Sequence, residues 1–251
     1  MSALRVERDG EILRVTLARP ERRNAFDADL IRELAEAFAD VGDARAVVLA
    51  GDGPSFCAGA DIEWQRSSID LTYDENVEDY RRLYRMLRAI DRCPAPVVAR
   101  VQGFALGGGS GLTACADIAV AAEDAVFGFS EVRLGIIPAV ISPIVVAKIG
   151  PAAARRYFLT GERLDASTAL RIGLVDEVAA DPDEAVERIL RDLLGGGPVA
   201  VREAKRLVLE PGGEEEILAR AAERRTSAEG QAGLRAFLER GAPPWAGGEP
   251  R

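Results

Sequence analysis

The stretch VQGFALGGGSGLTACADIAVAA, residues 101–122, contains the pattern on which the fold prediction rests. It predicts a glycine-rich turn that leads into a short helix and then into a strand at 118–121. The stretch FCAGAD at 56–61 has the same design, because it also follows a strand, contains small residues and precedes a helix start. Helix N-termini carry N–H groups without intrahelical partners, and small residues let a ligand oxygen approach them.

Two such loops facing each other would form an oxyanion hole from the N–H groups of Ala60 and Gly108. For either loop alone, a simple turn is the better explanation. Other glycine motifs do not fit 105–110: no glycine stands two residues after Ser110, as a nucleophile elbow requires. No lysine follows the glycines, as a P-loop requires, and the spacing is not GxGxxG.

Strands and helices alternate across the first two-thirds of the chain, which indicates an α/β architecture. Apolar and polar residues alternate over 4–8 and 12–17 around Asp9-Gly10, a pattern typical of a β-hairpin. Asp27 is a candidate N-cap for a helix to about residue 41. The other elements expected in this part are strands at 46–49, 97–101 and 126–129 and a helix at 73–91.

From about residue 143 onward the pattern is mostly helical. The expected segments are 144–149, 152–159, 166–172, 182–194, 199–209 and 214–238. The run GGGP at 195–198 is the clearest linker. We therefore predict a core at 1–195 and a helical C-terminal region at 196–251.

Composition excludes several kinds of partner and site. The 251 residues carry a net charge of −9, which argues against nucleic acid or an anionic membrane. The chain has no histidine, and Cys57, Cys93 and Cys115 show no CxxC spacing. This argues against a metal site and against Ser-His or Cys-His nucleophile pairs. We expect the three cysteines to be small buried hydrophobic residues.

Targeting signals are not apparent in the sequence. No run of eighteen apolar residues occurs, so no transmembrane helix is expected. The first residues, MSALRVERDGEI, lack the apolar stretch of a signal peptide. The expected location is cytoplasmic.

Further motifs stand in order around the two glycine-rich stretches. They are RPERRNAF at 19–26, FGFSEVRLGIIP at 127–138, LTGERLDASTALRIGLVDEV at 159–178 and AFLERGAPPW at 236–245. Together they resemble the enoyl-CoA hydratase/isomerase (crotonase) superfamily over nearly the whole chain. The resemblance implies a crotonase-type spiral of ββα units and a helical C-terminal region that forms a homotrimer or a dimer of trimers. It also implies an acyl-CoA thioester substrate, with no cofactor other than the coenzyme A within that substrate.

The resemblance also implies site residues. Ala60 and Gly108 match the two oxyanion-hole positions, and Glu131 matches one of two catalytic glutamates. The acyl-CoA-binding stretch corresponds to Ala60, Asp61, Ile62 and Glu63. The remaining candidates for contact with the substrate or its CoA are Ala58, Gly111, Pro138, Ala139 and Arg23.

Gly111 stands where hydratases of this superfamily have their other glutamate, which leaves three interpretations open. The protein is a lyase that hydrates a 2-enoyl-CoA with Glu131 alone as acid/base, a double-bond isomerase using Glu131, or a non-catalytic acyl-CoA-binding protein. The run from Gly107 to Gly150 is similar to methylglutaconyl-CoA hydratases of leucine catabolism, which favours the first interpretation. We expect Glu131 to have a raised pKa in the cleft.

The loss of the glutamate suggests a substrate hypothesis. A glycine at 111 would free volume and remove repulsion toward a substrate with its own carboxylate, and so favour a branched or dicarboxylic acyl group. Ala139 replaces a glycine common in better-known hydratases, and its N–H could still hold a water molecule.

Several other residues have two plausible roles each. Arg22 and Arg23 are candidates to contact the CoA phosphates or are simply exposed arginines. Trp64 and Gln65 line the acyl pocket or pack locally, and Ser110 and Ser142 are possible polar groups near the water. Phe237 and Trp245 are better explained as packing anchors than as substrate contacts.

Overall fold

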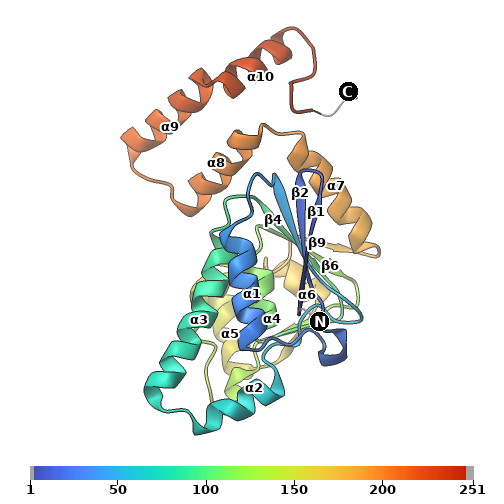
Figure 1. Ribbon diagram of the computed structural model, residues 1–251, viewed down its shortest axis with the longest axis vertical. Helices are drawn as coiled ribbons and strands as arrows, with labels where there is room; N and C mark the ends of the chain where they lie inside the picture. Colours follow the sequence, from blue (N-terminus) through green and yellow to red (C-terminus); the bar gives the residue numbers. More distant parts are fainter. Residues whose placement is uncertain (1–2, 247–251) are drawn as a thin grey trace.

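A six-stranded sheet forms the centre of the computed structural model, which describes residues 3–246 (Figure 1). Its order is β1-β2-β3-β4-β6-β9, with β1 antiparallel to β2 and every other pair parallel. A smaller sheet has the order β5-β7-β8. The strands are β1 Leu4–Asp9, β2 Ile12–Leu17, β3 Ala46–Gly51, β4 Val97–Val101, β5 Phe104–Leu106, β6 Ile118–Ala122, β7 Val126–Gly128, β8 Arg163–Asp165 and β9 Glu177–Ala179.

Helices connect the parallel strands, because a parallel pair needs a long crossover. The α-helices are α1 Ala28–Ala39, α2 Ile62–Ser67, α3 Tyr73–Asp91, α4 Gly108–Cys115, α5 Ser142–Thr160, α6 Ala166–Arg171, α7 Pro182–Leu194, α8 Pro198–Leu209, α9 Glu214–Thr226 and α10 Ala228–Leu238. Short 3-10 turns lie at Pro20–Arg22, Ser68–Asp70 and Glu131–Leu134. The predicted α/β fold class is confirmed.

The sheet has an apolar core on each face. On one face, α7 packs Val186 and Leu190 against strand residues such as Val48 and Val120. The other face belongs to the larger core, to which α1 contributes Leu34 and to which further helices, including α3, also contribute. Because successive strand residues point to opposite faces, a run of buried apolar residues serves both cores.

The sequence predicted the first elements closely. The predicted hairpin forms, with Asp9 paired to Ile12 across a turn at Gly10 and Glu11, and Gly10 has a φ of +56°. Asp27 caps α1 by accepting a hydrogen bond from the Leu30 N–H at 3.0 Å. The helix ends at Ala39, two residues before the predicted end.

Later elements differ in detail from the prediction. The segment 214–238, expected as one helix, is broken at Ser227, whose ψ is 157° and whose side chain caps α10. The segments 144–149 and 152–159 join across Gly150, at a φ of +73°, within α5. The strands β5, β8 and β9 were not predicted, because three residues carry too little pattern to reveal pairing with distant segments.

The last three helices extend beyond the end of the large sheet (Figure 1), and none of them has a buried residue. Arg45 connects the core to the linker, since its guanidinium donates to the Leu194 and Gly196 carbonyls at 2.6 Å each. Trp245 donates to the Gly195 carbonyl and packs against Gly233, whereas Phe237 is 78% exposed. Trp245 is thus a packing anchor, as expected, and Phe237 is not one within this chain.

Candidate active site

The two predicted loops lie side by side. The Cys57 N–H donates to the Phe104 carbonyl at 2.9 Å, and the Leu106 N–H donates to the Cys57 carbonyl at 3.0 Å. These two bonds form a parallel bridge between Cys57 and Ala105. Residues nearly fifty positions apart in sequence are therefore fixed next to each other by backbone contacts alone.

Glycine is required at the start of α4 by close packing. A Cβ on Gly108 would lie 2.1 Å from Cζ of Phe26, and a Cβ on Gly109 would lie 2.1 Å from the Cys57 carbonyl oxygen. Gly107 has a φ of +52°, which side chains rarely tolerate. The glycine run thus positions the first turn of α4 directly against the other loop.

The N–H groups of Ala60 and Gly108 both remain available. The backbone on either side of Ala60 is bonded to Phe26, through the Gly59 carbonyl and the Asp61 N–H, each at 2.9 Å. Gly108 is the first residue of α4, where an N–H has no intrahelical partner. Within the described residues, neither of the two N–H groups donates a hydrogen bond. A Cβ on Gly59 would lie only 3.8 Å from the Gly108 nitrogen, so the loops meet here.

Both residues line a cavity of about 230 Å³, and so does Glu131. Glu131 begins the 3-10 turn after β7, and its Oε1 lies 3.3 Å from the point where a Gly107 Cβ would stand. Its Oε2 is buried and has no hydrogen-bond partner in residues 3–246. Burial raises the pKa of the Glu131 carboxyl above its ordinary value, as the sequence predicted.

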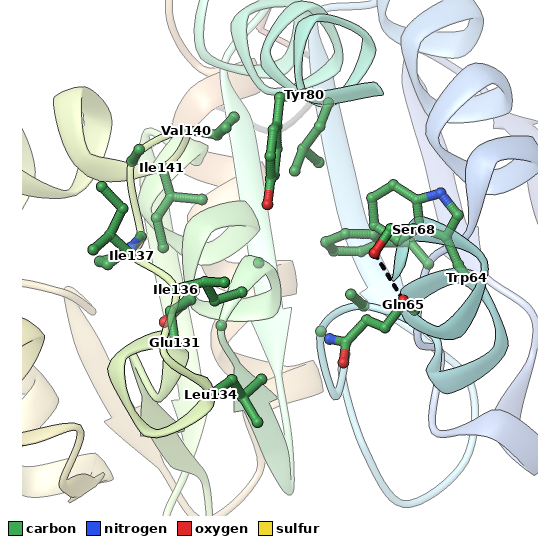
Figure 2. Close-up of a pocket in the computed structure, with 18 of the residues that line it drawn as sticks. Trp64, Gln65, Ser68, Tyr80, Glu131, Leu134, Ile136, Ile137, Val140 and Ile141 are labelled. Atoms are coloured by element: carbon green, nitrogen blue, oxygen red, sulfur yellow. Dashed lines mark hydrogen bonds between the residues drawn. The ribbon is translucent and has the colours of Figure 1, made fainter. Parts of the chain in front are cut away.

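Two different walls enclose the rest of the cavity (Figure 2). The segment after Glu131 supplies a mainly apolar wall with Leu134, Ile136, Ile137, Pro138, Ala139, Val140 and Ile141. The opposite wall, from α2, the turn after it and α3, contains Trp64, Gln65, Ser68, Asn76, Asp79, Tyr80 and Leu83. The Tyr80 hydroxyl points into the space between the walls in Figure 2.

The sequence and fold of this chain match known proteins over nearly its full length. The profile of the family described as enoyl-CoA hydratase/isomerase matches residues 7–248. The chain belongs to this family. It is therefore an enzyme of the crotonase superfamily, whose relatives include enoyl-CoA hydratases.

Three relatives illustrate the match. A crotonyl-CoA hydratase of Syntrophomonas wolfei is 34% identical over 208 residues, covering 80% of this chain and 78% of that protein. An enoyl-CoA hydratase structure from Shewanella pealeana has 37% identity and a TM-score of 0.90, covering 97% and 96% of the two chains. The structure of Pseudomonas aeruginosa AtuE has 37% identity and a TM-score of 0.93, covering 97% and 99%.

Gly111 does not occupy the place expected for it in this crotonase. It does not line the cavity, and a Cβ there would lie 2.6 Å from Cγ2 of Ile141. The space that the missing glutamate would have left is filled by Ile141, which is 3% exposed. The expected gain of acyl-pocket volume at Gly111 is therefore wrong in this structure.

The Ala139 N–H is also not available to hold water. It donates to the Ile137 carbonyl at 2.8 Å, within the tight turn that follows Glu131. Ala139 and Pro138 do line the cavity, and so does Ala58. These three residues contribute surface to the cavity wall.

The stretch that follows Ala60 lies outside the cavity. Asp61 caps α2 through the Glu63 N–H at 2.8 Å and pairs with Arg22 at 2.9 Å and with Arg19 at 3.3 Å. Burial alone would raise the pKa of the Asp61 carboxyl, but its hydrogen bonds to Arg22 and to the backbone outweigh burial and hold that pKa below its ordinary value. Ile62 is 74% exposed. Glu63 forms an ion pair with Arg66.

The two arginines near this stretch differ in what they contact. Arg22 is engaged by Asp61. Arg23 has a φ of +51° and holds its guanidinium 5.7 Å from the centre of the Phe104 ring, and Arg163 lies 5.5 Å from the same ring. Among the described residues, Arg23 forms no ion pair with a carboxylate.

The remaining candidates divide between the cavity and the core. Trp64 and Gln65 line the cavity, and Trp64 also packs against Phe26 with ring centroids 6.2 Å apart. Ser110 is buried and donates to the Ala105 carbonyl at 2.6 Å, and Ser142 donates to the Ala139 carbonyl at 2.8 Å. Neither serine lines the cavity.

The cysteines are buried, as predicted. Cys57, Cys93 and Cys115 are free thiols, and burial raises the pKa of Cys57 to about 12. A thiol with so high a pKa is a poor nucleophile. The described residues contain no cluster of three or more potential metal ligands, and none of their helices is long and apolar enough to cross a bilayer.

Asp79 and Tyr80 were missed as site residues. Tyr80 was noted only as part of the repeating face of the helix at 73–91, and nothing distinguished Asp79 from the other acidic residues there. Helical spacing identifies which residues share a face, but not which face meets a cavity formed with residues 130–141.

Proposed function

We propose that this protein reversibly hydrates a 2-enoyl-CoA, using Glu131 as the acid/base and the N–H groups of Ala60 and Gly108 as an oxyanion hole. One observation carries the proposal: Glu131, with a buried carboxylate oxygen that has no partner among the described residues, lines the same cavity as Ala60 and Gly108, whose N–H groups have no acceptor there. Unpaired buried polar groups are costly, so their gathering in one cavity is typical of a reaction site.

The chemistry follows from this arrangement. Glu131 takes a proton from water as the water oxygen bonds to Cβ of the substrate, and the double-bond electrons move through Cα onto the thioester oxygen. The N–H groups of Ala60 and Gly108 stabilise this enolate, and one such donor contributes roughly 3–4 kcal/mol in comparable sites. Glu131 then returns the proton to Cα, so that one water is added and the carboxylate is restored.

A double-bond isomerase is the second candidate. Its supporting observation is that Glu131 and Asp79 are the only carboxylates that line the cavity within the described residues, and Asp79 already accepts a hydrogen bond from Trp64 at 3.0 Å. One carboxylate can move a proton between Cα and Cγ without activating water. Mass spectrometry separates the two reactions, because hydration adds the mass of one water and isomerisation adds none.

Glu131→Gln tests the assignment. We expect the hydration rate of crotonyl-CoA to fall about 10²–10⁴-fold, with little change in CoA affinity, because the amide cannot shuttle the proton. Glu123→Gln, at an exposed turn between β6 and β7, is the matched control and should retain full rate. Unchanged turnover in Glu131→Gln would contradict the assignment, and binding without turnover in the native protein would favour the non-catalytic alternative.

The CoA moiety and the assembly are parts of the same proposal. Arg23 is suited to contact the CoA phosphates, since its guanidinium has no carboxylate partner in the described residues. The segment 196–251 is proposed as the trimerisation region, because none of the residues of α8–α10 is fully buried within one chain and Val208 and Leu238 are exposed by 83% and 77%. Light scattering should give three or six times the monomer mass, and a monomer in solution would refute this part.

A further inference from the structure

The wall formed by α2 and α3 carries a charge that the proposed hydration does not use. Asp79 lies on α3, and its side chain is 19% exposed. Its Oδ2 accepts a hydrogen bond from Trp64 Nε1 at 3.0 Å, and both residues line the cavity. The bond to the indole fixes the position of the carboxylate in this wall.

Asp79 has no cationic neighbour in the lining of the cavity, as far as the described residues go. Within the described part of the chain, the residues that line it include the carboxyl groups of Asp79 and Glu131 but no lysine or arginine. Arg82 approaches Asp79 Oδ1 at 3.4 Å, but its side chain is 57% exposed and does not line the cavity. Long, exposed pairs of this kind contribute little. The other polar groups of the wall, among them Gln65, Ser68 and Asn76, are neutral.

We propose that this wall restricts the enzyme to acyl groups without charge, and that Asp79 is the residue that excludes acyl groups ending in a carboxylate. The inference rests on the proposed function, because it places the thioester at Ala60 and Gly108 and the rest of the acyl group between the two walls. It replaces the expectation of a dicarboxylic substrate, which rested on added room and on reduced repulsion at Gly111. Ile141 occupies that room, and Asp79 adds a carboxylate to the cavity lining.

The physical argument concerns the cost of bringing a second anion into the cavity. A substrate carboxylate would lose water and would meet the Asp79 carboxylate without a cation to pair with. Repulsion between like charges several ångströms apart at a protein surface changes affinity by about tenfold. An uncharged acyl group avoids this cost and packs against the apolar wall.

The test compares kcat/KM for crotonyl-CoA and 3-methylglutaconyl-CoA in three proteins. The native enzyme should prefer crotonyl-CoA. Asp79→Asn keeps an acceptor for the Trp64 indole and removes the charge, so the ratio should shift about tenfold toward the carboxylate substrate. Glu78→Gln removes a charge from the neighbouring position, which pairs with Arg81 and does not line the cavity, and should leave the ratio within about twofold.

A native preference for 3-methylglutaconyl-CoA, or a ratio that Asp79→Asn does not change, would overturn the inference. Measurements of binding distinguish a failure of this inference from a failure of the proposed hydration. If none of the three proteins hydrates either thioester, the relative affinities for butyryl-CoA and glutaryl-CoA still measure the discrimination against acyl groups that end in a carboxylate. Butyryl-CoA should bind more tightly to the native protein, and Asp79→Asn should reduce the difference about tenfold. Equal affinities in the native protein would overturn the inference without reference to catalysis.

Discussion

The loop 56–61 and the loop 105–110 each contribute a residue with an unpaired N–H to the cavity lining, Ala60 and Gly108, but different forces hold the two loops in place. The second loop is fixed by packing, since Gly108 and Gly109 lie directly against Phe26 and the Cys57 carbonyl. The first loop ends in Asp61, which is fixed by ion pairs and by the cap of α2. A similar sequence pattern thus has two physical bases, one steric and one electrostatic.

The carboxylates near the two loops, Asp61 and Glu131, also differ in the partners that surround them. Asp61 has partners in Arg19, Arg22 and the Glu63 N–H, and its pKa is lowered. Glu131 has a buried oxygen without a partner in the described residues, and burial raises its pKa. A buried carboxylate with several donors stabilises the fold, whereas one with an unpaired buried oxygen costs stability and is suited to proton transfer.

Gly108→Ala should show the largest effect, because it disrupts the packing that holds the loop 105–110 in place. The new methyl group would lie 2.1 Å from Cζ of Phe26, so the first turn of α4 must move and carry its N–H away from the cavity. We expect the hydration rate to fall about 10²–10³-fold, as for loss of one oxyanion donor. Gly128→Ala is the control, because its Cβ would meet nothing closer than 3.5 Å, and it should retain the rate. An active Gly108→Ala enzyme would remove this N–H from the mechanism.

Gly111→Ala should have the next largest effect, and it acts on stability. Alanine is normally favoured over glycine within a helix by about 1 kcal/mol. Here its Cβ would lie 2.6 Å from Cγ2 of Ile141, and such overpacking costs about 1–3 kcal/mol. Denaturant unfolding should show a net loss of stability. Adding Ile141→Ala should relieve the clash, so strictly additive losses in the double variant would contradict the contact.

The sequence predicted the parts of this site that depend on local pattern or on family resemblance. The two loops, the cap at Asp27 and the place of Glu131 follow from motifs whose residues are close in the chain. What it could not supply are contacts between distant segments. Ile141 filling the space at Gly111, the Ala139 N–H bonding Ile137 and Asp79 bonding Trp64 all depend on how packed elements meet.

Asp61→Asn removes the ion pairs that hold the loop 56–61, and it should have a smaller effect on stability. Asparagine can still cap α2, but the charge pairing with Arg22 and Arg19 is lost. We expect a loss of about 1–2 kcal/mol at neutral pH, reduced from the value for a buried charged pair because the Arg22 side chain is 49% exposed. Since the folded pKa of Asp61 is lowered, its contribution is present above the unfolded pKa and is lost as the pH falls through the folded value. Urea unfolding at several pH values should show the two proteins converging in acid, and a constant difference would refute the charge argument.

Glu131→Gln should have the smallest effect on stability, and it should stabilise the protein where Asp61→Asn destabilises it. The folded pKa of Glu131 is raised, so the native state holds its proton more tightly than the unfolded chain does. Below the unfolded pKa both states are protonated and the substitution changes little. As the pH rises through the folded pKa, the ionised carboxylate becomes a cost that glutamine does not share, and the variant becomes the more stable protein. Urea unfolding of Glu131→Gln and the native enzyme should therefore diverge as the pH rises, as the Asp61→Asn comparison does, but here the variant rather than the native protein becomes the more stable. A variant that is less stable at neutral pH would mean that Glu131 has a stabilising partner, and the contrast between the two carboxylates would fail.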